Sequence, residues 1–328
     1  MPSDRIRLSV AEARDHAERA MRGIGYDSVE AHIVADHAID AALCGYEYSG
    51  LAKLLNIPEH RRFKEPRLPI RVLRETEVSA LYDGGNNVGM LALYHAARAT
   101  IAKAATNGFA IVGVTNSWMS GRSAYYVEMI ANADFDRDPH GGLLANRRPA
   151  RRQAPGARYQ PDRLRPAVVS RTDCLRHGNL GVYGHRFGVS RANGQLLPEG
   201  VAIDPEGQPT RDPTLARAGA LLPFGGYKGF GLAFIVQAFG LLTGSELDPD
   251  KDDGYVFVVF KPDLVADLDD FKQQLGELIE RIKATPRQPE VGEIRIPGER
   301  AFRSRERALR EGIEIDRLVY EALGTLHA

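Results

Sequence analysis

Residues 78–114 read VSALYDGGNNVGMLALYHAARATIAKAATNGFAIVGV and carry the clearest structural pattern of the chain. Val78 to Tyr82 predicts a strand that stops at the turn Asp83-Gly84-Gly85. Residues 90–106 predict a helix, with Gly108 as the left-handed residue after it. The continuous apolar run of residues 109–114 predicts a buried strand. Strand, helix and strand in this order indicate an α/β protein with a covered sheet.

The flanking segments extend this pattern in both directions. Upstream, Ser9 with Glu12 and Asp27 with Glu30 each form a capping-box pattern, which predicts two N-terminal helices. Downstream, we expect helices over 121–133, 229–244 and 264–284, and a buried strand over 255–260. The predicted buried stripe of the helix over 264–284 consists of Leu268, Phe271, Leu275, Leu278 and Ile282.

Composition excludes several classes of protein. The chain has 328 residues, with 43 Lys and Arg against 43 Asp and Glu, which argues against a nucleic-acid-binding or membrane-surface protein. Cys44 and Cys174 are too few for a disulfide scaffold, and no metal-ligand cluster is expected. No apolar stretch approaches the roughly 20 residues that span a bilayer. We therefore expect a soluble cytoplasmic protein.

The neutral total hides an uneven distribution of charge. Residues 136–191 contain 12 Arg and 4 Asp but no Lys or Glu, so this segment carries +8 and the rest of the chain −8. The segment has neither helical nor strand periodicity, and loops longer than roughly 15 residues are uncommon inside compact domains. One interpretation is a basic insertion that binds RNA or an anionic lipid, and the other is a segment translated in a shifted reading frame.

A glycine-rich element, PFGGYKGFG, occupies residues 223–231 and precedes an apolar helix. Its glycines permit close backbone approach, the helix N-terminus offers free N–H groups, and Lys228 adds a positive charge. These properties suit an anionic cofactor. The dinucleotide fingerprint G-x-G-x-x-G and the phosphate-binding P-loop are both absent from the sequence.

Together with its neighbours, this element resembles the non-Rossmann (type 2) malate/L-lactate dehydrogenase family, which also includes ureidoglycolate, sulfolactate and diketogulonate dehydrogenases and cyclic imino-acid reductases. The resemblance covers about residues 8–135 and 193–328. Six segments carry it, in the family's order: residues 42–45 (ALCG), 82–85 (YDGG), 116–117 (NS) with 125–126 (YY), 197–202 (LPEGVA), 223–231 (PFGGYKGFG) and 295–300 (RIPGER). The resemblance implies an α/β fold of the non-Rossmann malate/L-lactate dehydrogenase type, with a mixed sheet covered by helices and a helical N-terminal part.

The resemblance also implies where the substrate binds, and there the sequence departs from the family. A family Ser-His-Gly-x-x-Arg segment reads Tyr48-Ser49-Gly50-Leu51-Ala52-Lys53 here, so Ser49 stands for the histidine and Lys53 for the arginine. A second family histidine is replaced by Met119. Neither serine nor methionine ionises near neutrality, so the proton donor is open among Tyr46, Tyr48, Tyr125 and Lys53. The remaining expected substrate contacts are Asn116 and Arg122, with a surface arginine as the alternative for Arg122 and plain pocket lining for Met119.

On the cofactor side, the resemblance implies NAD or NADP, a small carboxylate substrate and a homodimer. From composition and charge, no nucleic acid, membrane or metal is expected as a partner. The expected cofactor contacts are Gly225, Gly226, Tyr227, Lys228, Pro297, Gly298 and Glu299. We expect a helical segment over 1–75 on the substrate side with dimer contacts, a cofactor-binding core over 76–135 and 193–290, and a C-terminal segment over 291–328.

The segment 136–192 is interpreted as translated out of frame. The family has a Gly-Thr-Asn-Pro stretch and an Asp-x-x-Thr-Ser stretch at this place, and both are absent here. Residues 158–165 can be encoded so that a shift of one base yields Gly-Thr-Asn-Pro, and residues 175–185 so that the same shift yields Phe-Asp-Met-Gly-Thr-Ser. The literal chain is then expected to bind nicotinamide weakly and to be poorly soluble.

The predicted function is that of an NAD(P)-dependent oxidoreductase that moves a hydride to or from a small 2-hydroxy or 2-oxo acid or a cyclic imino acid. The alternative is a catalytically degenerate member, or a non-enzymatic protein that binds through its basic loop.

Overall fold

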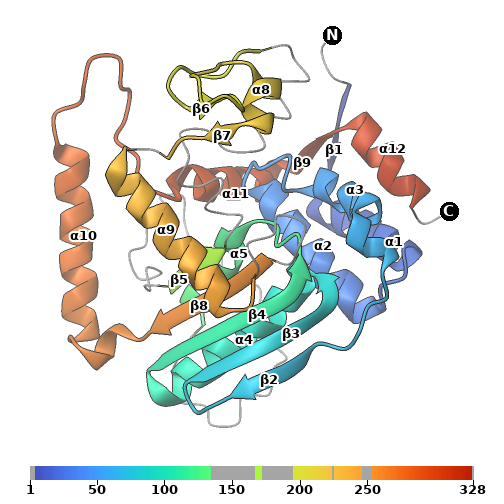
Figure 1. Cartoon of the computed structure of the whole chain (residues 1–328), viewed down its shortest axis with the longest axis horizontal. Coiled ribbons are helices and arrows are strands. Elements are labelled where there is room, and N and C mark those ends of the chain that lie inside the picture. The colour runs from blue at the N-terminus through green and yellow to red at the C-terminus, as the bar shows by residue number, and fades with distance from the viewer. Residues whose placement is uncertain (1–3, 134–166, 172–194, 224, 246–252, 327–328) are drawn as a thin grey trace.

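The computed structural model describes residues 4–133, 167–171, 195–223, 225–245 and 253–326. Its centre is a five-stranded mixed sheet in the order β2-β3-β4-β8-β5 (Figure 1). Strands β3 and β4 are parallel, whereas every other neighbouring pair in this sheet is antiparallel. The bounds of these strands are Arg71–Glu75 (β2), Ser79–Val88 (β3), Phe109–Trp118 (β4), Ala167–Arg171 (β5) and Asp253–Phe260 (β8).

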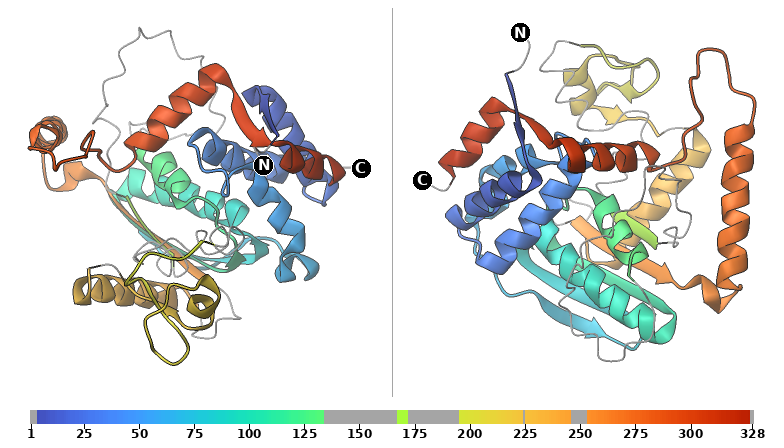
Figure 2. Two further views of the ribbon diagram at one scale, coloured as in Figure 1. Left: turned by 90° about the horizontal axis from the view of Figure 1, so that it is seen from above. Right: turned by 180° about the vertical axis from the view of Figure 1, so that it is seen from behind.

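Helices cover both faces of this sheet. Helices α4 (Gly89–Asn107) and α5 (Ser123–Ala131) lie on one face, and α9 (Tyr227–Leu242) lies on the other (Figure 2, left). The apolar run of β4 forms the middle of this core, where Ala110, Val112 and Val114 are fully buried. The predicted mixed sheet with helical covering is therefore confirmed.

The N-terminal helices form a second core together with the end of the chain. Helices α1 (Val10–Gly23) and α2 (Ser28–Leu43) both begin with the predicted capping boxes, at Ser9 and Asp27. Strand β9 (Ile313–Asp316) pairs antiparallel with β1 (Arg5–Leu8), and Ile313 and Ile315 are buried among the N-terminal helices. The C-terminal residues thus complete the N-terminal helical unit. Its other elements are α3 (Leu51–Glu59), η1 (Arg61–Lys64), α11 (Glu299–Glu311) and α12 (Arg317–Thr325).

A small third unit lies beside the sheet and contains the LPEGVA motif. Leu197, Val201, Ala202 and Ala216 form its apolar cluster. Its elements are β6 (Ala202–Ile203), α8 (Pro213–Ala218) and β7 (Ala220–Leu221). Two elements follow the main sheet, η3 (Pro262–Leu264) and α10 (Leu268–Ala284).

Two local predictions are wrong. Asp83-Gly84-Gly85 does not end a strand, because β3 continues to Val88 and pairs with β4 on both sides of a register shift. The apolar stripe predicted for α10 is not buried: Leu278 is 51% and Ile282 40% exposed, and only Ile279 of this helix is buried. Helix α10 stands at the periphery (Figure 1), and Leu268, Phe271 and Leu275 of that stripe are only half-buried.

Helix α4 ends as the sequence predicts, with a left-handed glycine directly after it. Gly108 follows α4 with φ of 74°, in the left-handed region, and its N–H donates to the carbonyl of Ala104.

Cys44 is buried, which raises the pKa of its thiol to about 11, and Cys174 lies outside the described residues. Within the described ranges, no helix is both long and apolar enough to cross a membrane.

Candidate functional site

The carboxyl ends of β3 and β4 form one edge of the sheet, and the backbone there is strained. Because these strands are parallel neighbours, both end at this edge, where α/β sheets commonly bind ligands. Asn86, Asn116 and Met119 have φ of 58°, 51° and 56°, a region that non-glycine residues rarely adopt. Such conformations persist only where surrounding contacts fix them, and they gather at functional sites.

Asn116 joins a carboxylate to a guanidinium at this edge. Its Nδ2 donates to Asp83 Oδ1 at 2.7 Å, and its Oδ1 accepts from Arg62 Nη2 at 2.6 Å. Burial acts to raise the pKa of Asp83, but hydrogen bonds from the Gly85 N–H, Asn116 and Arg71 outweigh it and lower that pKa. The Asp83 carboxylate therefore stays ionised and orients the Asn116 amide.

Asn86 fixes the segment that carries Arg62. Its Nδ2 donates to the carbonyls of Arg62 at 3.0 Å and Glu65 at 3.2 Å, while its own carbonyl accepts from Trp118 Nε1 at 3.1 Å. The neighbouring Gly85 has φ of 61°, and a Cβ there would lie 2.2 Å from the Leu68 carbonyl oxygen. Only glycine fits this close approach.

His60 lies over the end of β4 in a positively charged environment. Its ring stacks on Trp118 with 4.3 Å between centroids and 5° between planes. Its Nδ1 accepts from the Arg62 backbone N–H at 3.3 Å, so the neutral ring carries its proton on Nε2. Burial lowers the pKa of His60, and the charges of Arg61, Arg62 and Lys53 lower it further. The imidazole is thus mainly neutral, and the surrounding cations favour an anionic ligand.

Lys53 approaches the same region from the first turn of α3, and Ser49 directly precedes Gly50, the N-cap of this helix. The chain turns at Gly50, where a Cβ would lie 3.0 Å from Ala42 Cβ on α2. Lys53 Nζ lies 4.8 Å from the centre of the half-exposed Tyr48 ring, and its charge acts on His60. Met119 packs against the apolar cluster that contains Leu51, Leu54 and Trp118. The structure therefore places Asn116 and Met119 at the end of β4 and Lys53 near His60, with Tyr48 beside Lys53.

Arg122 belongs to a buried group of four charges. It donates to Asp40 Oδ2 at 2.6 Å and to Glu128 Oε1 at 2.5 Å, and its side chain is 8% exposed. Arg305 bridges the same two carboxylates from α11, at 2.7 and 2.5 Å. The four residues connect α2, α5 and α11. In this geometry Arg122 already binds two carboxylates of its own chain.

The tyrosines proposed as proton donors differ in environment. Tyr125 donates to Asp36 Oδ2 at 2.8 Å, and burial raises its pKa. Tyr46 is 37% exposed and lies between the guanidinium groups of Arg122 and Arg300, at 5.5 and 4.6 Å from its ring centre. Tyr48 is the most exposed of the three tyrosines, at 49%, and lies beside Lys53.

The two groups of expected cofactor residues lie apart. Gly298 precedes α11 with φ of 95°, and the buried Glu299 carboxylate accepts from the Ile296 N–H at 3.0 Å and pairs with Lys283. Gly225, Gly226, Tyr227 and Lys228 are exposed at the start of α9. Figure 2 (left) shows α9 and α11 on opposite sides of the sheet.

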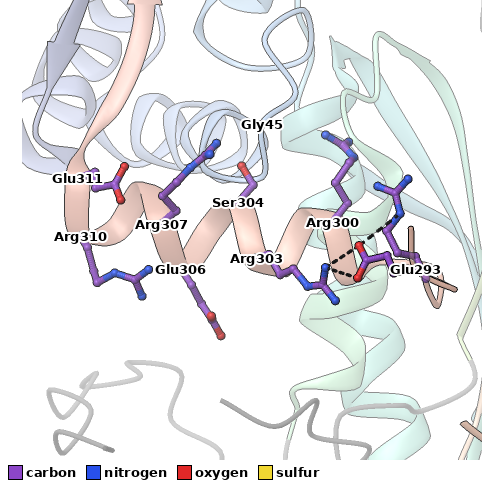
Figure 3. Close-up of a pocket in the computed structure, with 10 residues that line it drawn as sticks. Gly45, Glu293, Arg300, Arg303, Ser304, Glu306, Arg307, Arg310 and Glu311 are labelled. Atoms are coloured by element: carbon purple, nitrogen blue, oxygen red, sulfur yellow. Dashed lines mark hydrogen bonds and ion pairs between the residues drawn. The ribbon is translucent and has the colours of Figure 1, made fainter. Parts of the chain in front are cut away.

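A groove of ≈ 600 Å³ runs along α11 (Figure 3). Its lining combines Gly45 at the end of α2 with arginines and glutamates from residues 293–311, and it therefore extends to both sides of the turn at residues 297–299.

Sequence reasoning missed His60, Arg62, Asp83 and Asn86 as parts of the site. The positive run His60-Arg61-Arg62 after a helix was a usable signal, as was the pair Asn86-Asn87 after two glycines. Within the described ranges, no group of three His, Cys, Asp or Glu side chains is placed to hold a metal ion.

Comparison with known proteins gives one family model that matches, described as malate/L-lactate dehydrogenase, over residues 8–135 and 184–324. The chain is 29% identical to L-sulfolactate dehydrogenase of Methanothermobacter thermautotrophicus, over 97% of this chain and 95% of that protein. It is 30% identical to malate dehydrogenase of Pyrococcus horikoshii, over 94% and 91%. It is 31% identical to Delta(1)-pyrroline-2-carboxylate/Delta(1)-piperideine-2-carboxylate reductase of Pseudomonas putida, over 73% of each.

Solved structures share the fold. Sulfolactate dehydrogenase from Methanocaldococcus jannaschii superposes with a TM-score of 0.76 at 22% identity, covering 98% of this chain and 96% of that one. Malate dehydrogenase from Entamoeba histolytica gives a TM-score of 0.78 at 17% identity, covering 98% and 97%.

Proposed function

The chain belongs to the malate/L-lactate dehydrogenase family, and we propose that it transfers a hydride between a nicotinamide cofactor and a small 2-oxo or 2-hydroxy acid or cyclic imino acid. It is an oxidoreductase of this family, whose relatives are named for hydroxy-acid dehydrogenases and imino-acid reductases. The observation that carries the proposed site is the cationic edge of β3 and β4, where Lys53, Arg61 and Arg62 surround His60.

In the proposed site, Lys53 binds the substrate carboxylate. An ammonium group is a strong partner for a carboxylate, and this one lies among further positive charges. The Asn116 amide is held by Asp83 and Arg62, so it can orient the substrate without rearranging. Ser49, which directly precedes the N-cap of α3, is proposed as a further substrate contact. Tyr48 is proposed as the proton donor, because its exposed phenol lies beside Lys53, whereas Tyr125 is buried and donates to Asp36.

The start of α9 fits the anionic part of a dinucleotide. Gly225 and Gly226 have φ of 66° and 61°, and no atom lies within 4 Å of a Cβ built at either position. Free backbone N–H groups and Lys228 at a helix N-terminus suit a phosphate. When bound, the nicotinamide supplies or accepts the hydride. Pro297, Gly298 and Glu299 are proposed as cofactor contacts as well, although their turn lies on the opposite side of the sheet from α9, and the proposed cofactor is NAD or NADP.

The test is oxidation of NADH and NADPH, followed at 340 nm with a panel of 2-oxo acids and cyclic imino acids. Lys53→Met is expected to raise KM about tenfold or more while changing kcat much less, because the lost contact holds the carboxylate in ground and transition states alike. Lys272→Met on α10 removes the same charge far from the site and serves as the control. An unchanged KM in Lys53→Met would contradict the role of Lys53, and absence of turnover with every substrate would contradict the activity.

We also propose that residues 136–192 are translated out of frame. The family model stops matching at residue 135 and resumes at 184, which supports this proposal. The segment lies outside the described residues except for β5. The nucleotide sequence tests the proposal directly: codons for residues 158–165 that cannot yield Gly-Thr-Asn-Pro in a shifted frame would exclude it.

A homodimer is the proposed assembly. Large apolar side chains of α9 are exposed, with Phe230 at 63%, Phe234 at 66% and Leu242 at 74%. An exposed apolar surface of this kind is typical of an interface. Light scattering coupled to size exclusion tests it, and a monomer at micromolar concentration would contradict it.

A further inference from the structure

Two independent contacts hold the His60 ring in one orientation. His60 ends α3 and begins η1, and its Nδ1 accepts from the Arg62 backbone N–H at 3.3 Å. The flat side of the ring stacks on Trp118 with 4.3 Å between centroids. Trp118 is only 3% exposed, and its Nε1 donates to the Asn86 carbonyl at 3.1 Å. The imidazole therefore rests on a support that is itself fixed, and its plane is set before any ligand binds.

The other nitrogen of this ring carries a proton that it can donate. Because Nδ1 is an acceptor, the neutral His60 ring has its hydrogen on Nε2. Among the described residues, Nε2 has no hydrogen-bond partner, and it is absent from the buried unpaired polar atoms, so solvent reaches it. A preorganised donor that the protein leaves unpaired is available to an acceptor on a ligand.

The charges around His60 keep the ring neutral. Burial lowers its pKa most, and Arg61, Arg62 and Lys53 lower it further. Glu65 is the one listed charge that acts in the opposite direction, and its effect is the weakest. Near neutral pH the ring therefore offers a single N–H at Nε2 instead of a full positive charge.

His60 and Lys53 belong to the same side of α3. They are seven residues apart, which corresponds to about two helical turns or about 10 Å along the axis. The long side chain of Lys53 can span much of this distance, and its charge acts on the His60 ring. Tyr48 lies beside Lys53, with 4.8 Å between Nζ and the ring centre. The proposed carboxylate anchor and proton donor thus lie near the His60 N–H.

We propose that His60 is a catalytic residue whose Nε2–H donates a hydrogen bond to the C2 oxygen of a 2-oxo acid. The inference rests on the proposed function, in which Lys53 binds the carboxylate and Tyr48 donates the proton. As C2 accepts the hydride, the π electron pair of the C=O bond moves to the oxygen, and the oxygen takes the proton of the Tyr48 hydroxyl. The His60 proton is not transferred. A fixed donor at the oxygen on which charge develops stabilises the transition state.

This contact also makes His60 a specificity-determining residue. A protonated cyclic imino acid carries an N–H in place of the C2 oxygen, so it cannot accept the His60 hydrogen bond. His60 should therefore accelerate reduction of 2-oxo acids and contribute nothing to reduction of protonated cyclic imino acids.

The first experiment compares two substitutions of His60 in the full chain. His60→Phe keeps a flat ring for Trp118 but removes the N–H, and we expect kcat for 2-oxo acids to fall about a hundredfold while KM changes less than about threefold. His60→Gln gives up the stack but can place an amide N–H close to the Nε2 position, so it should recover at least about tenfold of this loss. His32→Phe, on the exposed side of α2, is the control, and circular dichroism checks that each variant folds.

A second measurement does not depend on turnover. Calorimetry compares oxamate, an unreactive 2-oxo acid analogue, with propionate, which lacks the C2 oxygen. We expect the wild-type chain to bind oxamate at least about tenfold more tightly, and His60→Phe to lose most of this difference.

Three results would overturn the role of His60. They are a kcat of His60→Phe close to that of wild type, a loss that His60→Gln does not recover, and a preference for oxamate that is unchanged in His60→Phe. A loss of the same size with cyclic imino acids would also overturn it, because that pattern indicates general damage to the site. If His60→Phe abolishes the oxamate preference but no substrate is reduced by wild type, the contact stands and only the proposed function fails.

Discussion

Replacing Arg122 with methionine should destabilise the protein by about 3 kcal/mol or more. Arg122 is 8% exposed, and its carboxylate partners Asp40 and Glu128 are 19% and 18% exposed. Removing one partner from a buried ion pair costs about 3–5 kcal/mol, because the remaining charges stay buried without compensation. Arg305 still bridges the two carboxylates, so the loss should lie toward the lower end of this range.

Urea unfolding followed by circular dichroism measures this loss as the free energy of unfolding. Arg303→Met is the matched control, because it breaks the pair with Glu293 while Arg303 is 55% exposed, and surface pairs contribute about 0–1 kcal/mol. A rescue variant sharpens the test. Arg122→Met combined with Glu128→Gln leaves Asp40 and Arg305 as a balanced pair, and should regain about 1 kcal/mol or more over the single variant.

The competing expectation was that Arg122 anchors the substrate carboxylate. If the stability loss of Arg122→Met equals that of Arg303→Met, the structural role argued from the buried charges is refuted. A rise in KM without loss of stability would then favour the substrate role.

Three further predictions follow from the site and the sequence. Fluorescence of Trp118, the single tryptophan, should fall as the stacked His60 gains its proton, with a midpoint below the usual histidine pKa of about 6.5; a pH-independent signal, or one that persists in His60→Gln, would contradict the stack. Gly85→Ala should lower the free energy of unfolding by about 2 kcal/mol or more, because its φ is positive and its Cβ would meet the Leu68 carbonyl; a wild-type urea midpoint would refute this. Restoring the shifted frame over residues 136–192 should strengthen NADH binding, measured by fluorescence, and raise the soluble yield; equal affinity in both versions would argue against the frame interpretation.

Local patterns predicted the elements whose stability is local. The capping boxes at Ser9 and Asp27 and the left-handed Gly108 depend on neighbouring residues alone, and each is confirmed. The Asp83-Gly84-Gly85 segment misled because its conformation is set by strand pairing with β4, which no short window of sequence contains. The exposed stripe of α10 shows the same limit, since periodicity predicts an apolar face but not a partner for it.

The candidate site was predictable only in part for the same reason. The resemblance pointed to Asn116, but its partners Asp83 and Arg62 are 33 and 54 residues away in the chain and meet it only after folding. Arg122 was proposed for the substrate because a lone arginine beside a motif suggests an anion. Its partner Glu128 lies six residues along in the helix that Arg122 caps, but Asp40 comes from α2, 82 residues upstream, and no spacing in the sequence indicates that contact.

The pairing of β1 with β9 sets a condition on how the chain can be made. Ile313 and Ile315 complete the core of the N-terminal helices, so a ribosome that has synthesised only the first half of the chain releases a unit that still lacks one strand. A shifted frame that never returned would remove that strand and leave the N-terminal core open to solvent. A frame that returns before Gly194 preserves it. If the proposed second shift occurs, it preserves a part of the molecule that lies almost two hundred residues upstream of it.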